Sequence, residues 1–380
     1  MKILLCSYFK FPNGCAGSVR HEKFAQMLKS LEHDVLVVGT GRCNDFRIET
    51  FKNIQYTSLR YATPGLKGKI KTRLEYWKNL KKVIQQYTPD CIIMDDLRPL
   101  VTIKIKRFAK SKDILLIHDS VEWYSRQQYK LNFLAPALIC KNIINRYLID
   151  DRCRVIAIST YLMRHFEAKR VQCVNIPIVV DDEDIVKDKS LEEVINFAYA
   201  GQAGKKDYLH VMLAAMMLLT AEEREKFKFH ILGCSEQQMI DNGIPAQVIQ
   251  ELRPSLVIYG RVPRDEVFRV LQKSNFTLLI RSEELRYAKA GFPTKVVESL
   301  ARSTPVIANI TSDLGEYLID GYNSFIVPGC SAEDLAPVLK KAVSLSMAQR
   351  EKMCQNAYDT ALNRFHYKHF LDRLQTILSR

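Results

Sequence analysis

The sequence has no apolar run near the ~18 residues that a helix needs to cross a bilayer. Its apolar start, MKILLCSYFKFPNG, is interrupted by Lys10 and Pro12, so we interpret it as a first buried strand and not as a signal peptide. The ten cysteines include no Cys-x-x-Cys pair, which argues against a metal site and fits reduced thiols. These absences favour a cytoplasmic protein without a bound metal.

Two other classes of motif are missing. The chain has no zinc-ligand spacing, no RNP-type aromatic motif and no basic-region helix, so nothing indicates a nucleic-acid partner. It also lacks the full Gly-x-Gly-x-x-Gly of a dinucleotide-binding fold, which argues against a dehydrogenase.

What the chain does contain is a regular alternation of short apolar runs and longer amphipathic stretches. A length of 380 residues allows two domains, each with its own core. Strands separated by helices predict parallel sheets that are covered on both faces, here two doubly wound α/β domains with a cleft between them. The predicted strands are 3–7, 35–38, 91–94, 114–117 and 155–158 in the first half, and 197–199, 228–232, 256–259, 276–280, 305–308 and 324–327 in the second.

The boundary between the domains is predicted where a proline is followed by an acidic, polar run, in NIPIVVDDEDIVKDKSLEE. We therefore expect a first domain over 1–178, a linker over 179–194 and a second domain over 195–362. The last segment, 363–380, has aromatic and apolar residues at helical spacing from Phe365 to Leu378.

Basic charge is concentrated in the first half of the chain. Residues 1–180 contain 31 Lys and Arg against 15 Asp and Glu, whereas residues 181–380 contain 25 against 27. The first half therefore carries +16 and the second −2, within a total of +14. A positive field on one domain predicts an anionic partner for that domain.

The segment Arg281 to Asn309, RSEELRYAKAGFPTKVVESLARSTPVIAN, is the most informative. It is predicted to form a polar loop, a short helix and a buried strand, with Gly291, Phe292 and Pro293 breaking the chain before the helix. A helix N-terminus presents free N–H groups and a positive dipole end, which bind phosphate. Thr294 and Lys295 add a hydroxyl and a cation there. Glu298 can accept two hydrogen bonds from a sugar diol.

This layout resembles the nucleotide-sugar signature of retaining glycosyltransferases with the GT-B fold, in particular glycosyltransferase family 4. The family usually has two glutamates seven residues apart, and here Glu298 matches the second while Ala290 stands at the first. The resemblance implies two Rossmann-like domains, a C-terminal helix that crosses back to the first domain, a UDP- or GDP-linked sugar donor, no other cofactor and no metal. Ala290 implies an unusual donor sugar, such as a deoxy or amino sugar, or a contact from Lys289 in its place.

The resemblance assigns roles to several further residues. His118 is the first candidate, and Asp119 the second, for contact with the donor sugar or the acceptor hydroxyl. Lys206 and Lys295 would compensate charge on the leaving diphosphate. Gln202 occupies the position of the family's arginine, so Arg281, Lys289 or Lys295 would supply the missing cation. The other donor-binding candidates share positions in glycine turns or beside them: Gly14, Gly17, Gly201, Lys205, Gly260, Arg261 and Val262.

Each of these motifs alone also fits an ordinary structural turn. Their order and spacing from about residue 195 to 328 make the resemblance specific there, and it is looser over residues 1–180. Ser18 is expected to cap the helix after the first glycine-rich loop.

Two stretches of the first half are basic and amphipathic. Gly65–Gln86 contains seven Lys and Arg, and Arg126–Asn145 contains no acidic residue. Such elements suit an anionic membrane surface, so we expect a peripheral protein at the inner face of the cell membrane with a glycan or polyprenyl-diphosphate-linked acceptor, in polysaccharide biosynthesis. The alternatives are an inactive nucleotide-sugar-binding protein, which turnover would exclude, and a GT-B sugar-nucleotide epimerase.

Overall fold

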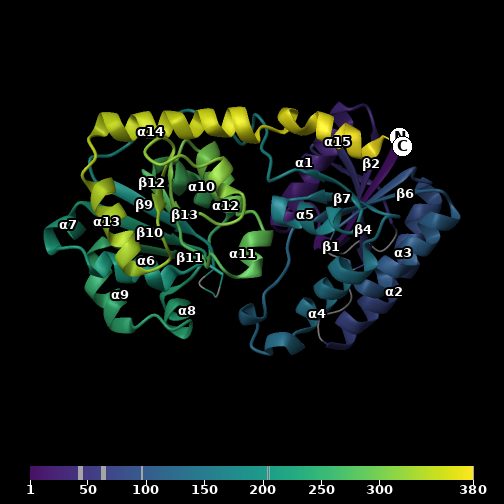
Figure 1. The fold of residues 1–380 in the computed structure, drawn as a ribbon, viewed down its shortest axis with the longest axis horizontal. Coiled ribbons are helices and arrows are strands. Elements are labelled where there is room, and N and C mark those ends of the chain that lie inside the picture. The colour runs from purple at the N-terminus through teal and green to yellow at the C-terminus, as the bar shows by residue number, and fades with distance from the viewer. Residues whose placement is uncertain (42–45, 61–65, 96, 203, 205, 380) are drawn as a thin grey trace. The chain divides into compact units, whose positions relative to one another are not determined.

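The computed structural model describes residues 1–380 except 42–45, 61–65, 96, 203, 205 and 380, and the side chains of 60 and 66–74 are also left undescribed. The chain forms two compact units (Figure 1). Unit 1 comprises Met1–Val179 and Tyr367–Arg380, and unit 2 comprises Val180–His366. Among the described residues, no helix has both the length and the apolar character to span a bilayer.

Unit 1 is built on an eight-stranded sheet with the order β3-β4-β2-β1-β5-β6-β7-β8. Every pairing is parallel except β3 with β4. The chain leaves β1 in one direction toward β2 and in the other toward β5, so the topological switch point lies between β1 and β5. The strands are β1 Lys2–Lys10, β2 Asp34–Gly41, β3 Glu49–Phe51, β4 Ile54–Arg60, β5 Cys91–Met94, β6 Leu115–Ser120, β7 Arg154–Ala157 and β8 Gln172–Asn175.

Helices cover this sheet, and the last of them comes from the C-terminal end of the chain. They are α1 Ala16–Ser30, α2 Leu66–Tyr87, α3 Pro99–Ser111, α4 Pro136–Ile143, α5 Thr160–Glu167 and α15 Leu371–Leu378. Leu374 and Ile377 of α15 are part of the unit 1 core, and Arg154 of β7 donates to the Ile377 carbonyl at 2.8 Å. The C-terminal helix therefore packs on the first unit, as the resemblance implied.

The prediction of one helix from Phe365 to Leu378 is wrong in its first half. His366 pairs as an isolated bridge with Val180, and Tyr367–Phe370 forms a single 3₁₀ turn before α15 begins at Leu371. The apolar spacing over these residues reflects burial on two different surfaces and not one helical face.

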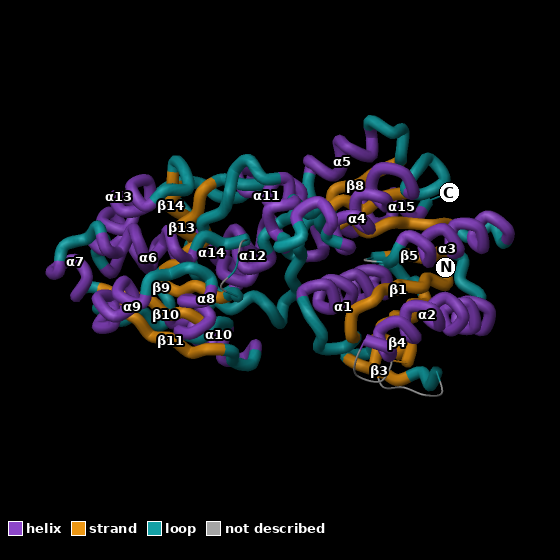
Figure 2. The backbone as a smooth tube through the Cα atoms, turned by 90° about the horizontal axis from the view of Figure 1, so that it is seen from below, coloured by secondary structure: helices purple, strands orange, loops and turns teal. Residues whose placement is uncertain are grey.

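Unit 2 has a six-stranded, fully parallel sheet with the order β11-β10-β9-β12-β13-β14 (Figure 2). Its switch point lies between β9 and β12. The strands are β9 Ile195–Ala200, β10 Phe227–Leu232, β11 Leu256–Gly260, β12 Phe276–Leu279, β13 Val306–Asn309 and β14 Ser324–Val327. The helices are α6 Leu209–Met217, α7 Ala221–Glu225, α8 Glu236–Asp241, α9 Ala246–Leu252, α10 Arg264–Lys273, α11 Arg286–Ala290, α12 Thr294–Ala301, α13 Ala332–Val343 and α14 Met347–Thr360.

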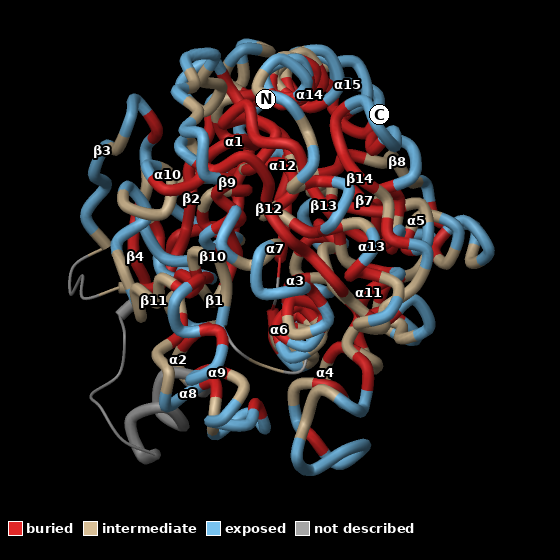
Figure 3. The backbone as a smooth tube through the Cα atoms, turned by 90° about the vertical axis from the view of Figure 1, so that its left-hand side faces the viewer, coloured by how far each residue is buried: buried red, intermediate tan, exposed pale blue. Residues whose placement is uncertain are grey.

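Both sheets are buried on their two faces, which is why their strands appear in the sequence as continuous apolar runs. In unit 2, Phe197, Phe229, Phe276 and Phe325 lie inside the core, and Figure 3 shows buried backbone along the strands. The two doubly wound α/β units confirm the predicted fold class. Every predicted strand lies on an observed one, whereas β3, β4 and β8 were not predicted.

The segment that was expected to be a linker packs on unit 2. Val186 donates its N–H to the Ala301 carbonyl at 2.8 Å, and the Ser303 hydroxyl donates to the Val186 carbonyl at 2.6 Å. Residues 180–194 therefore belong to the compact body of unit 2.

Candidate functional site

Three glycine turns meet at the carboxyl edge of the unit 2 sheet. Gly201 follows β9, Gly233 follows β10 and Gly260 ends β11. Gly233 has φ +97°, donates its N–H to the Gly260 carbonyl at 2.7 Å, and would place a Cβ 2.6 Å from the Gly201 carbonyl oxygen. A side chain at Gly233 is therefore excluded by both the left-handed backbone and the close approach of two strands. This edge is where ligands bind in open parallel sheets.

Beside these turns, a buried carboxylate holds two cations at the β9/β12 switch point. Asp207 accepts from Arg281 Nε at 2.7 Å and from Lys295 Nζ at 2.5 Å. Tyr199 donates its hydroxyl to Asp207 Oδ2 at 3.1 Å, and Lys295 Nζ lies 4.6 Å from the centre of the Tyr199 ring. A Cβ at Gly201 would stand 2.5 Å from Lys295 Nζ, so the glycine makes room for the ammonium group.

The pKa shifts follow from this arrangement. Burial by itself raises the pKa of Asp207, but the charges and hydrogen bonds of Lys295 and Arg281 outweigh it, and the pKa lies below its ordinary value. Burial lowers the pKa of Lys295, and the neighbouring Asp207 carboxylate opposes that shift. The two cations share one carboxylate, so the cluster has a net positive charge at the sheet edge.

The segment 281–309 folds around this cluster. The Arg281 backbone is clamped by Asn309, whose side chain accepts from the Arg281 N–H at 3.0 Å and donates to the Arg281 carbonyl at 2.8 Å. Helix α12 begins at Thr294 after Gly291, buried Phe292 and Pro293, and Lys295 is its second residue. Thr294 is partly exposed at this helix start, and the helix end itself points positive charge toward the cluster.

Glu298 is the fifth residue of α12, about one turn after the helix begins. Its Oε1 accepts from Arg264 at 3.2 Å, and its side chain is 27% exposed. Burial raises the pKa of Glu298, with the Arg264 charge acting in the opposite direction. Lys295 and Glu298 both line a small cavity together with Ala200 of β9 and Thr277 of β12.

The other predicted donor residues of unit 2 occupy varied positions. Lys206 is exposed, and its backbone carbonyl accepts from the Tyr287 hydroxyl at 2.6 Å, whereas Lys205 lies outside the described residues. Lys289 is exposed on α11. Ala290, at the position of the family's first glutamate, is fully buried.

The residues of the turn after β11 differ in their exposure to solvent. Gly260 has φ +67°, Arg261 is exposed, and Val262 packs against a small apolar cluster that includes Leu232 and Val270. The exposed arginine and the glycine turn remain available to a ligand at this edge.

In unit 1, the corresponding carboxyl edge at the β1/β5 switch point contains a buried ion pair. Arg20 of α1 donates two hydrogen bonds to Asp119 of β6, from Nε to Oδ2 at 2.8 Å and from an Nη to Oδ1 at 2.9 Å. The same guanidinium donates to the carbonyls of Pro177 and Ile176 at 2.7 and 3.0 Å. Arg20 thereby ties α1, β6 and the segment after β8 together.

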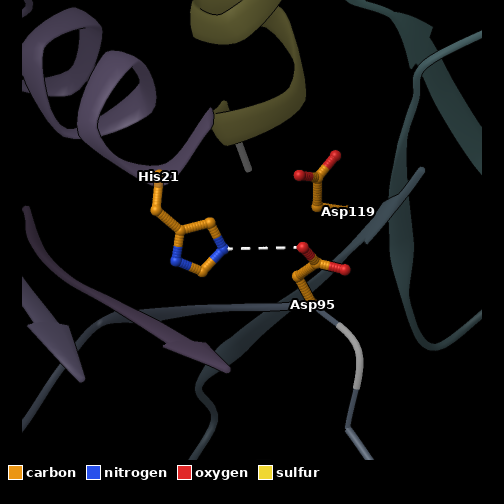
Figure 4. A group of neighbouring side chains, drawn as sticks. All are labelled: His21, Asp95 and Asp119. Atoms are coloured by element: carbon orange, nitrogen blue, oxygen red, sulfur yellow. Dashed lines mark ion pairs between the residues drawn. The ribbon is translucent and has the colours of Figure 1, made fainter. Parts of the chain in front are cut away.

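His21 and Asp95 lie next to this pair (Figure 4). His21 Nε2 is 3.9 Å from Asp95 Oδ2, and burial, assisted by the Arg20 charge, lowers the pKa of His21 to about 3. With Asp119 these residues form a group of metal-ligand types within the described part of the chain. Because the Arg20 guanidinium already bonds both Asp119 oxygens, we assign this group to structural pairing and not to a cation.

His118 and Asp119 have different neighbours in the structure. As neighbours on β6 they point to opposite faces of the sheet. His118 packs edge-on against Phe166 of α5 with ring centres 6.2 Å apart, and burial lowers its pKa to about 3. The structure thus places both inside unit 1 and buried, His118 at 3% exposure and Asp119 at 0%.

The glycine-rich loop before α1 is tightly packed. A Cβ at Gly14 would overlap the Lys10 carbonyl at 2.1 Å, and one at Gly17 would meet the Phe9 ring at 2.7 Å. Ser18 is the third residue of α1, with Cys15 at the N-cap. The Ser18 hydroxyl accepts from the Gly14 and Cys15 N–H groups, so Ser18 helps to cap α1, as expected, but from the third helical position of a capping box and not from the N-cap.

Sequence reasoning missed the residues that organise both edges. Asp207, Arg20 and Asp95 had no assigned role. A single sequence offers one signal for Asp207, its position directly after the two lysines of a glycine turn. Nothing local marks Arg20, because its partner Asp119 is 99 residues away.

Known proteins resemble unit 2 in a family match and the whole chain in a pairwise match. Residues 180–360 match the family model described as glycosyl transferases group 1. An uncharacterized glycosyltransferase of Methanocaldococcus jannaschii is 23% identical over 350 residues, covering 88% of this chain and 86% of the relative.

Solved structures share the fold over the whole chain. Sucrose-phosphate synthase of Thermosynechococcus elongatus superposes with a TM-score of 0.76 at 14% identity, covering 99% of this chain and 98% of that one. Anabaena HepE, solved in complex with UDP and glucose, gives a TM-score of 0.68 at 13% identity, covering 100% and 99%. The two-domain GT-B architecture is therefore common to all of them.

Proposed function

We propose a retaining hexosyl transfer from a nucleotide sugar for this GT-B glycosyltransferase, whose residues 180–360 match the family model of glycosyl transferases group 1. The observation that carries the proposal is the Asp207–Arg281–Lys295 cluster at the unit 2 switch point, beside three glycine turns and the start of α12. Its net positive charge suits a nucleoside diphosphate. A UDP-linked donor is supported by the HepE complex with UDP and glucose.

In the proposed reaction, the bond from the anomeric carbon to the diphosphate oxygen breaks, and the acceptor hydroxyl oxygen bonds to that carbon on the same face. The hydroxyl proton passes to the departing diphosphate, and no metal is required. Lys295 and Arg281 stabilise the negative charge that grows on the diphosphate, and Asp207 keeps both cations in place before the donor arrives. Glu298 binds the ribose diol.

Thermal-shift measurement against a panel of UDP- and GDP-sugars tests donor binding. A ligand present at 100 times its Kd should add about 2.7 kcal/mol to the free energy of unfolding. Because Ala290 replaces the first family glutamate with a buried methyl group, a deoxy or amino sugar is expected among the best ligands. No stabilisation by any nucleotide sugar would contradict the proposal.

The substitution Glu298→Gln is expected to weaken nucleotide affinity by about 1.5–3 kcal/mol, since charge-assisted hydrogen bonds to the ribose are lost. Isothermal titration calorimetry with the nucleotide measures the change. Arg264→Gln is the matched control, because it breaks the Arg264–Glu298 ion pair and leaves the carboxylate in place. Equal losses in both variants would mean that Glu298 acts only through Arg264.

For the acceptor, we propose a lipid-linked or other anionic glycan bound by unit 1 in polysaccharide synthesis, with the protein peripheral at the inner face of the cell membrane. The +16 balance of residues 1–180 supports this proposal. Of the basic residues in Gly65–Gln86, the side chains of Lys67, Lys69 and Lys71 lie outside the described residues, whereas Lys78 and Lys81 of α2 are exposed.

Replacing Lys78, Lys81 and Lys82 with glutamine is expected to weaken binding to anionic vesicles by about 1 kcal/mol per charge at low salt. Co-sedimentation with vesicles at increasing salt measures this, because attraction fades within a Debye length of about 8 Å at physiological ionic strength. Glutamine at Lys340, Lys341 and Lys352 of unit 2 is the matched control. If both triple variants bind vesicles like the wild type, the three lysines of α2 do not contribute to membrane binding.

A catalytically silent nucleotide-sugar-binding protein is the alternative, and the buried Ala290 favours it over an epimerase. Release of free nucleotide from a bound nucleotide sugar in the presence of an acceptor distinguishes the proposed transferase from a silent binding protein, because only the transferase turns the donor over.

A further inference from the structure

Unit 1 exposes a short apolar segment, which we call the 130–134 tip, from Lys130 to Leu134. Leu131, Phe133 and Leu134 are 62%, 66% and 62% exposed. Other exposed large apolar residues are scattered along the described chain, as is usual, but here three fall within four consecutive positions. Clustering of this kind indicates an interaction surface.

The tip has a fixed base. It leads into α4, where the N-cap residue Ala135 and Leu138 in the helix are buried. Trp123, which precedes the tip, is also buried and donates its indole N–H to Asn142 of α4 at 2.8 Å. In Figure 3 much of the segment around α4 is exposed, so the anchored helix holds an exposed tip.

The tip backbone forms its own hydrogen bonds. Asn132 donates its N–H to the Tyr129 carbonyl at 3.1 Å, and Leu134 donates to the Leu131 carbonyl at 3.0 Å within a 3₁₀ turn. These peptide groups are paired before any contact is made. Transfer to an apolar medium therefore carries a smaller desolvation penalty than it would for an open loop.

Charge around the tip has one sign. From residue 123 to 149 there are four basic residues and no acidic one. Arg126, Lys130 and Arg146 are exposed. Lys130, beside the apolar residues of the tip, can keep its ammonium group at the level of lipid phosphates while its aliphatic stem lies along the acyl chains.

We propose that the 130–134 tip inserts into the surface of an anionic bilayer, with Leu131, Phe133 and Leu134 in the acyl region and the flanking cations on the headgroups. This inference rests on the proposed membrane contact of unit 1 and adds a hydrophobic component to it. A stable protein interface buries roughly 800 Å² and about 20–30 residues on each partner, whereas the tip has only five residues. Insertion into a bilayer surface has no such minimum contact area.

Flotation of the full-length protein with phosphatidylcholine vesicles, with and without phosphatidylglycerol, tests the proposal. The variant F133S/L134S is compared with L218S/I319S, which removes two exposed apolar residues of unit 2. Insertion predicts that the tip variant loses about tenfold or more in partition to the anionic vesicles at both low and high salt, since the lost term is hydrophobic. The unit 2 variant should bind like the wild type.

Two outcomes would overturn the proposal. In the first, both variants bind vesicles equally well, and salt alone removes binding, so that the membrane contact is purely electrostatic. In the second, the tip variant loses self-association in sedimentation velocity while vesicle binding is unchanged, so that the tip contacts another copy of the chain. Calorimetry with the nucleotide, done without lipid, keeps this result separate from donor binding in unit 2.

Discussion

Replacing Lys295 with alanine is expected to lower kcat about 100- to 1,000-fold while the protein stays folded, because one preorganised donor to a developing negative charge is lost. Lys295 Nζ is held 2.5 Å from Asp207 Oδ2 at the start of α12, so its position is set before the donor binds. Arg281→Ala is expected to act in the same direction, since Arg281 shares that carboxylate. Steady-state kinetics with the donor found by thermal shift measure the effect.

The control for this prediction is Lys352→Ala, an exposed lysine of α14. Calorimetry of donor binding separates a loss of ground-state affinity from a loss of transition-state stabilisation, which alone lowers kcat. Activity equal to the wild type in the Lys295 variant would remove it from the diphosphate site. Lys206→Ala tests the other predicted lysine, and its exposed position leads us to expect a smaller loss.

Replacing Asp119 with alanine is expected to lower the free energy of unfolding of unit 1 by about 3–5 kcal/mol, because Arg20 is left as a buried charge without its carboxylate. Both side chains are almost fully buried, at 4% and 0% exposure. The guanidinium would keep only its bonds to the Ile176 and Pro177 carbonyls. This loss is large compared with the effect of most single substitutions.

Urea unfolding followed by tryptophan fluorescence measures this change selectively. The chain has two tryptophans, Trp77 and Trp123, and both lie in unit 1. Arg152→Leu, which breaks the exposed Arg152–Asp150 pair, is the matched control and should leave the transition where it is. The double variant R20M/D119L should recover much of the loss, and its failure to do so would mean that the carboxylate has a role beyond the pair.

The fold could be predicted because its signals are local. A strand that is buried on both faces is mostly apolar, so runs such as Cys91–Met94 and Ser324–Val327 are recognisable without their neighbours, and both match the observed strands. The break at Gly291–Pro293 likewise fixes where α12 begins. By contrast β3, with only three residues, and β8, with no fully buried residue, lack such a run and were missed.

The candidate site was predictable only in outline. The sequence by itself placed Lys295 at a helix start and put Arg281 and Gly201 at strand ends, because those features depend on a few adjacent residues. Tertiary structure alone decided that Asp207 joins Arg281 and Lys295, which are 74 and 88 residues away. It also decided that Asp119 belongs to Arg20 and not to His118. The physical reason is that ion pairs form between groups that strand order brings together, and strand order is fixed by the packing of the whole sheet.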